Sequence, residues 1–124
     1  MNFEWSDYLE LARELAGQTA SPAGTEARLR SAISRAYYAA FCKCRNHLPD
    51  VGTQLPQGAA IHQFVRDEFK DSTDKKRKKI GNDLDRLRAD RNKADYDDSI
   101  SGLGKMVYMD IELAEQIINA LGRL

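Results

Sequence analysis

Apolar side chains recur every three or four residues along most of this chain, which is the spacing of one helix face. No segment alternates apolar and polar residues as a half-buried strand would. The pattern predicts five helices, over 6–16, from Thr25 to the residue before Pro49, over about 61–68, from within 72–74 to the polar segment 95–99, and over 100–121. A linker over 18–24 joins the first two.

The apolar positions also predict which side chains form the core. In the first helix they are Tyr8, Leu11, Ala12 and Leu15; in the second, Leu29, Ala32, Ile33, Ala36, Tyr37, Ala40, Cys44 and Leu48. The second helix is the longest and is predicted to be central. Thr25 is its expected cap, and Phe64 and Phe69 of the third helix are expected to enter the core. Alanines at 32, 36, 39 and 40 permit close helix packing, within the fold or across a two-fold axis.

Length and composition fit one modest domain over residues 1–124, an all-α, five-helix up-and-down bundle. No apolar run approaches the roughly 18 residues of a spanning helix, so we expect a cytoplasmic protein with no membrane partner. Cys42 and Cys44 are too close to close a useful loop, and on a helix they point about 200° apart without further ligands. Gly102 and Gly104 lack the strand and lysine of a phosphate loop. We therefore expect no metal and no other cofactor.

Charge is balanced in total, with 19 basic and 19 acidic residues, but it is unevenly distributed. Residues 66–93 hold eleven basic and seven acidic groups, whereas 94–124 hold two and six. The basic excess comes mainly from the run Lys75, Lys76, Arg77, Lys78 and Lys79 at a helix start, where the macrodipole disfavours cations. Either nearby aspartates shield this run on a solvated face, or it contacts nucleic-acid phosphates.

The densest group of chemically capable residues is the segment 87–96, where the fourth helix gives way to a turn. Arg91 continues the apolar line of Ile80, Leu84 and Leu87, and an inward guanidinium needs an anionic partner. Asp95, four residues on, can supply it within the helix. Alternatively, Arg91 stabilises charge on an RNA phosphate while Tyr96 stacks or donates a hydrogen bond.

Three blocks together resemble the small stand-alone prokaryotic HEPN proteins: residues 34–41 (SRAYYAAF), residues 61–64 (IHQF) and residues 87–96 (LRADRNKADY). The blocks follow the family's order and spacing and span about half of the chain. The resemblance implies a bundle that forms a homodimer. It also implies action on RNA in toxin–antitoxin or defence systems, commonly with a nucleotidyltransferase partner.

Active members of that family are metal-independent endoribonucleases in which an arginine and a histidine four to six residues later act together. No histidine follows Arg86, Arg88 or Arg91 at that spacing. We therefore assign catalytic roles to Arg91 and Asn92 at the phosphate, to Asp95 or His62 as base, and to Tyr96, which is also a candidate nucleotidylation acceptor. Phosphate contact is assigned to Arg88 and to the basic run, Lys75, Lys76, Arg77, Lys78 and Lys79. The alternative is a non-catalytic module that docks a nucleotidyltransferase or RNA.

Overall fold

The computed structural model describes residues 2–17 and 24–124, and within them the regular secondary structure is all α-helix, with no strand. Five helices are present in this part of the chain, as the pattern predicts: α1 (Asp7–Gly17), α2 (Thr25–Asp50), α3 (Ala60–Lys70), α4 (Lys75–Tyr96) and α5 (Leu103–Leu121). The predicted linker lies, apart from Gly24, outside the described residues.

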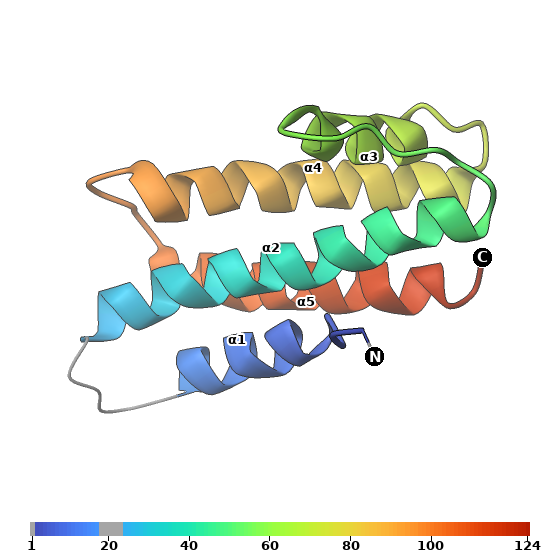
Figure 1. Ribbon diagram of the computed structural model, residues 1–124. Helices are drawn as coiled ribbons and strands as arrows, with labels where there is room; N and C mark the ends of the chain where they lie inside the picture. Colours follow the sequence, from blue (N-terminus) through green and yellow to red (C-terminus); the bar gives the residue numbers. More distant parts are fainter. Residues whose placement is uncertain (1, 18–23) are drawn as a thin grey trace.

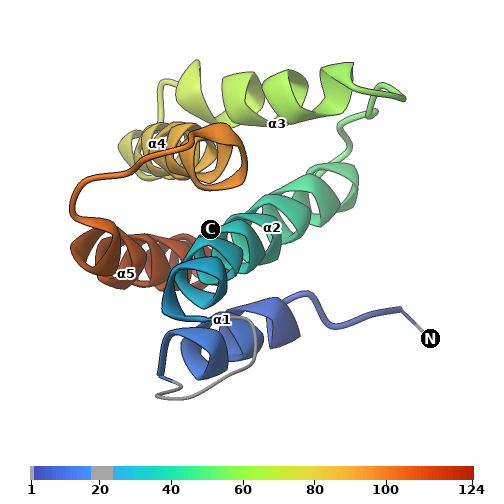
Figure 2. The same cartoon turned by 90° about the vertical axis from the view of Figure 1, so that its left-hand side faces the viewer.

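Helix α2 runs through the middle of the bundle and contacts the four other helices (Figures 1 and 2). Helices α1 and α4 run opposite to α2 and α5, and the shorter α3 covers the outer side of α4 (Figure 1). The predicted central role of α2 is thus confirmed. Its burial extends beyond one stripe, because Ala39, Phe41 and Cys42 are buried as well. All four of its alanines at 32, 36, 39 and 40 are fully buried within a single chain.

Both predicted ends of α2 need correction. Gly24, with φ +80°, precedes the helix, and Thr25 is its first residue rather than its cap. The Thr25 hydroxyl instead accepts a hydrogen bond from Arg28, which also donates to the Leu15 carbonyl of α1. The helix also continues through Pro49, because a proline in the last turn removes only one backbone N–H. The carbonyls of Leu48 and Pro49 accept from the following residues 51–53.

Smaller corrections concern the apolar faces. Leu11, predicted to be buried, is 37% exposed, and Leu9 and Ala12 are the buried residues of α1. Phe69 is fully buried as expected, whereas Phe64 packs at the edge of the core. Helix α5 begins at Leu103 rather than Ile100, which stays half-buried before it. The line Ile80, Leu84 and Leu87 is buried as predicted.

Both ends of α4, the helix that carries most of the predicted site, are fixed by polar contacts. At its start, the Asp74 side chain accepts from the Lys76 backbone N–H at 3.1 Å. At its end, Arg30 of α2 donates to the carbonyls of Ala94 (3.0 Å) and Asp97 (2.6 Å). Along its length α4 crosses α3 at Gly81, where a Cβ would lie 2.3 Å from the Lys70 nitrogen. These contacts set the position of Arg91 relative to α2 and α3.

Candidate functional site

Arg91 lies in the last two turns of α4, with its guanidinium against α2. Its side chain is 15% exposed, and Nη1 meets the Asp95 carboxylate at 3.4 Å, so the predicted pairing is present but long. The guanidinium carbon lies 5.2 Å from the ring centre of Tyr37 and 5.5 Å from that of Tyr38. Nε is buried and makes no hydrogen bond to the described residues. One salt bridge and two aromatic faces therefore hold a guanidinium that keeps unused donor capacity.

His62 lies in the first turn of α3 and also reaches α2. Its Nδ1 is 2.8 Å from the Tyr37 hydroxyl, and its ring stacks on Phe41 with centroids 4.2 Å apart. Burial lowers the pKa of His62, and the positive charges of Arg91, Arg66 and Arg88 lower it further. The imidazole is therefore neutral at pH 7, with one ring nitrogen able to accept a proton.

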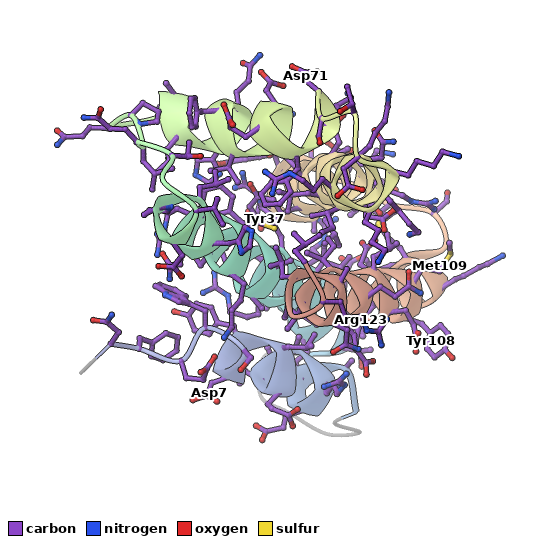
Figure 3. The ribbon with its side chains drawn as sticks, turned by 90° about the vertical axis from the view of Figure 1, so that its right-hand side faces the viewer. Asp7, Tyr37, Asp71, Tyr108, Met109 and Arg123 are labelled. Atoms are coloured by element: carbon purple, nitrogen blue, oxygen red, sulfur yellow. The ribbon has the colours of Figure 1, made fainter. Side chains whose placement is uncertain are left out.

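Tyr37 connects these two side chains. It projects from α2 into the space between α2, α3 and α4, touching Arg91 with its ring and His62 with its hydroxyl (Figure 3). Burial raises the pKa of Tyr37 to about 12, so its hydroxyl keeps its proton. We call the group Tyr37, Tyr38, Phe41, His62 and Arg91 the Arg91–His62 cluster. Its members come from three helices and are up to 54 residues apart in sequence.

Further arginines surround the cluster. Arg35 lies over the Tyr38 ring at 5.3 Å. Arg66 is 7% exposed and pairs with Asp85 through Nε at 3.0 Å, while its buried Nη1 has no hydrogen-bond partner among the described residues. Hydrogen bonding from Lys70 lowers the pKa of Asp85, which therefore stays ionised. Arg66 therefore adds a buried positive charge beside the cluster, and Asp85 balances it through Nε.

Comparison of the chain with models of known protein families, with curated proteins and with solved structures finds no match.

The other predicted residues of the 87–96 segment do not all join the cluster. Asp95 is held in the salt bridge to Arg91. Asn92, which follows Arg91 in the sequence, is half-buried. Tyr96 is the last residue of α4 and is 76% exposed, and its ring makes no aromatic contact within the described part of the chain. Of the two candidate bases, only His62 lies beside Tyr37 with a neutral ring.

The predicted basic run lies at the opposite end of α4. Lys75, Lys76, Lys78 and Lys79 are exposed, and Arg77 lies over the Phe69 ring at 4.7 Å. Lys79 pairs with Asp83 at 2.5 Å. Fifteen residues separate Lys76 from Arg91, or about 22 Å along the helix axis. Arg88, by contrast, lies close enough to His62 to lower its pKa. The structure therefore divides the predicted phosphate contacts into two regions.

Tyr37, Tyr38 and Phe41 are cluster residues that the sequence reasoning counted only as core or as part of a family block. Their spacing placed them on α2, and nothing in the sequence indicated that His62 would stack against them. A second missed feature is a buried carboxyl pair. Asp110 of α5 is fully buried and faces Asp90 of α4, which is 9% exposed. Burial and Asp90 raise the pKa of Asp110 to about 8.

Two further properties bear on the predicted partners. Within residues 2–17 and 24–124, no three His, Cys, Asp or Glu side chains are grouped so as to hold a metal ion. None of the helices in the described part of the chain has both the length and the apolar character that crossing a bilayer requires.

Proposed function

We propose that this chain is a HEPN-type domain that acts on RNA, and that the Arg91–His62 cluster contacts the RNA phosphate and carries out metal-independent cleavage. The observation that carries the proposal is that Arg91 and His62, from different helices, both contact Tyr37. No histidine follows the arginine at the family's spacing along α4, and His62 of α3 supplies an imidazole in the same cluster.

The geometry suggests a role for each group. When Nδ1–H of His62 donates to the Tyr37 oxygen, Nε2 carries the lone pair and can accept the proton of a ribose 2′-hydroxyl. Arg91 offers its remaining donors to the phosphate and stabilises the charge that develops there. Arg66 and Arg88 add positive charge around the same point. No metal is required for these steps. In this proposal the active form is a homodimer, the cellular setting is a toxin–antitoxin or defence system in the cytoplasm, and a nucleotidyltransferase is the expected partner.

The test is cleavage of an end-labelled structured RNA in EDTA. Wild type should cut, whereas Arg91→Lys and His62→Gln should each lose about a hundredfold or more of the rate while remaining helical by circular dichroism. His47→Gln is the matched control, because the chain has only two histidines and His47 lies outside the cluster. Equal cleavage by wild type and His62→Gln would refute the proposed base.

A second candidate is a binding module without catalysis. The observation that favours it is that Asp95 and two aromatic rings already engage Arg91, whereas the basic run is exposed on the surface. In that case no variant cleaves RNA, and binding is salt-sensitive and weakened by replacing Lys75, Lys76, Lys78 and Lys79 with glutamine. An affinity that stays constant across a salt titration would exclude phosphate contact by this run.

A further inference from the structure

A groove lies between the start of α4 and the end of α5. Helix α4 begins and α5 ends at the same end of the bundle (Figure 1), where Arg123 follows α5 (Figure 3). Its volume is about 520 Å³, within the range of pockets that bind specific ligands. Ile80 and Ile117, which are 2% and 1% exposed, close its floor, and half-buried Ala120 and the aliphatic stems of the basic residues add the accessible apolar surface. Lys76, Lys79 and Arg123 stand around it. We call these six residues and the space between them the α4–α5 groove.

The charge around this groove is positive in sum, because three basic residues and one acidic residue, Asp83, line it. Lys79 pairs with Asp83 of its own helix, but neither Lys76 nor Arg123 forms an ion pair with any described residue. Lys76 and Arg123 also line an adjoining hollow of about 420 Å³, which reaches Arg77 and His47. Asp74 also lines this hollow, so the surface from the end of α5, past the start of α4, to the end of α2 is positive in sum but not free of carboxylates. A ligand that spans it should carry several negative charges.

The lining distinguishes between two kinds of anionic ligand. Channels for single-stranded nucleic acid combine positive charge with aromatic side chains on which bases stack. Among the described residues, no aromatic side chain lines the α4–α5 groove, and its apolar lining is aliphatic. Two adjacent helices with an apolar seam between them and polar groups at its edges form the kind of surface that receives an amphipathic helix. Gln116 and Asn119, both exposed at the edge, supply neutral hydrogen-bonding groups.

We propose that the α4–α5 groove binds an acidic amphipathic helix of another protein. The helix places apolar side chains on Ala120 and on the aliphatic stems of the basic residues, above the buried Ile80 and Ile117, and carboxylates against the charged ends of Lys76, Lys79 and Arg123. This surface is separate from the Arg91–His62 cluster, about 22 Å away along α4, so the proposal does not depend on RNA cleavage.

The first test uses defined peptides of about 18 residues, long enough to form a helix in isolation. One peptide has leucine along one face and glutamate elsewhere, a second has lysine in place of glutamate, and a third has alanine in place of leucine. Addition of the leucine–glutamate peptide to the ¹⁵N-labelled full-length protein should shift the amide signals of Ile80, Gln116, Ile117 and Ala120. The other two peptides should bind about tenfold more weakly or worse, because each lacks one half of the complementarity.

The second test uses two variants with the same charge change. Lys76→Gln combined with Lys79→Gln removes charges that line the groove, whereas Lys75→Gln combined with Lys78→Gln removes two charges from the same helix turns outside it. The first pair should weaken binding of the leucine–glutamate peptide by about tenfold, and the second by much less.

Three results would overturn the proposal: equal loss of affinity in both double variants, binding of the alanine peptide as tight as that of the leucine peptide, or amide shifts that map away from the groove. A single-stranded RNA oligonucleotide that shifts the same four amides and competes with the peptide would instead identify the surface as a nucleic-acid contact. The circular dichroism spectra of both double variants should match that of wild type, because the four lysine side chains are exposed.

Discussion

At the scale of single residues, different neighbouring charges act on the pKa values of the two histidines of this chain. Burial lowers the pKa of both below the ordinary value of 6.5, but the next cause is Arg91 for His62 and Arg77 for His47. Removing a neighbouring positive charge favours the imidazolium form. Arg91→Gln should therefore raise the pKa of His62 and leave that of His47 unchanged, as followed by NMR titration of the imidazole carbon-bound protons.

Arg77→Gln is the matched control for this titration, since it should raise the pKa of His47 and leave that of His62 in place. A shift of both histidines in either variant would indicate a general change of structure rather than a specific pairing. No shift of His62 in Arg91→Gln would mean that the two cluster residues are not electrostatically coupled, and the proposed division of roles between them would lose its basis.

How much of the site the sequence could predict depends on sequence distance. The Arg91–Asp95 contact was predictable because helix geometry alone brings residues i and i+4 together. The contact between His62 and Tyr37 was not predictable. It depends on where α3 docks on α2, and α3 begins ten residues after α2 ends. His62 was named as a candidate base through the family resemblance, and its neutral, stacked position was visible only once the fold was known.

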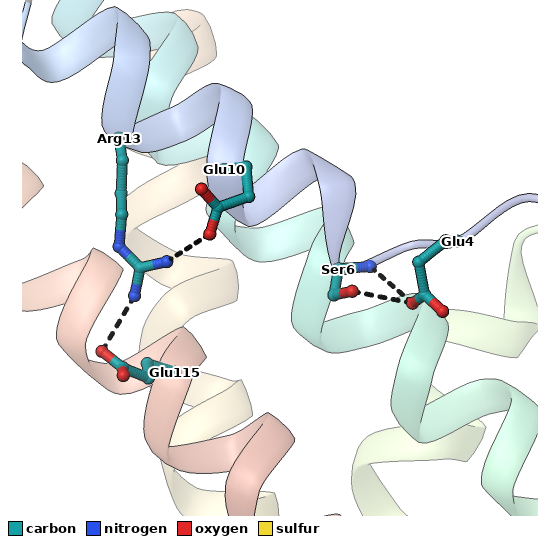
Figure 4. A network of polar contacts seen from close by, with 5 residues as sticks. All are labelled: Glu4, Ser6, Glu10, Arg13 and Glu115. Atoms are coloured by element: carbon teal, nitrogen blue, oxygen red, sulfur yellow. Dashed lines mark hydrogen bonds and ion pairs between the residues drawn. The ribbon is translucent and has the colours of Figure 1, made fainter.

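At the scale of helices, Arg30 and Arg13 can be compared by how much their contacts between helices contribute to stability. Arg30 of α2 is largely buried and bonds the carbonyls that end α4, whereas Arg13 of α1 makes exposed pairs with Glu10 and with Glu115 of α5 (Figure 4). Arg30→Gln should cost about 1–3 kcal/mol, because the carbonyls of Ala94 and Asp97 lose a charged donor, and should speed amide exchange at the end of α4. Arg13→Gln should cost less than about 1 kcal/mol. Urea unfolding and hydrogen exchange measure both; equal costs would contradict this assignment.

A second prediction at the scale of helices concerns how closely α3 and α4 pack where they cross at Gly81. In an open helix, Gly→Ala stabilises by up to about 1 kcal/mol, and Gly104→Ala in α5 should do so because nothing lies within 4 Å of the added Cβ. In Gly81→Ala the Cβ would meet the Lys70 backbone at 2.3–2.6 Å, so the two helices must separate. A net loss of about 1–3 kcal/mol is expected in thermal or urea unfolding. Stabilisation of both variants would show that the crossing can relax.

The helices themselves followed from the sequence more fully than their contacts. Spacing alone predicted all five, and the errors fall at ends and on edges. Pro49 was taken as a stop because proline breaks helix interiors, but in a last turn its missing N–H costs little. Leu11 was placed inside because it is apolar, but Leu9 and Ala12 are the residues that face α2 and α5. Gly81 carried no signal in the sequence, since its role depends on a helix from elsewhere in the chain.

At the scale of the whole molecule, stability depends on pH through the buried carboxyl of Asp110, which faces Asp90. Asp110 is fully buried, neither of its oxygens accepts a hydrogen bond from any described residue, and its pKa is raised to about 8. The positive charge of Arg86 lowers this pKa, but it offsets the rise only in part. In the unfolded chain the same carboxyl has its ordinary pKa near 3.8. The folded state therefore holds a proton that the unfolded state releases between these two values.

The sign of the effect follows from this difference. Below about pH 4 the carboxyl is protonated in both states and its contribution to stability is complete. As the pH rises toward 8 the unfolded chain ionises first, so the free energy of unfolding falls, and the loss is complete above about pH 8.

Asp110→Asn cannot ionise, and its amide can donate to Asp90. The variant should therefore match wild type or fall slightly below it at pH 4 and exceed it at pH 9 by on the order of 5 kcal/mol, which is the difference that a shift of about four pKa units corresponds to. Glu112→Gln, which removes an exposed carboxylate from the same helix, should show no such crossover. Urea unfolding of the three proteins from pH 4 to pH 9 measures the difference. If the free energies of unfolding of wild type and Asp110→Asn change in parallel with pH, Asp110 is already ionised in the folded protein, and a contact other than those with Arg86 and Asp90 stabilises its charge.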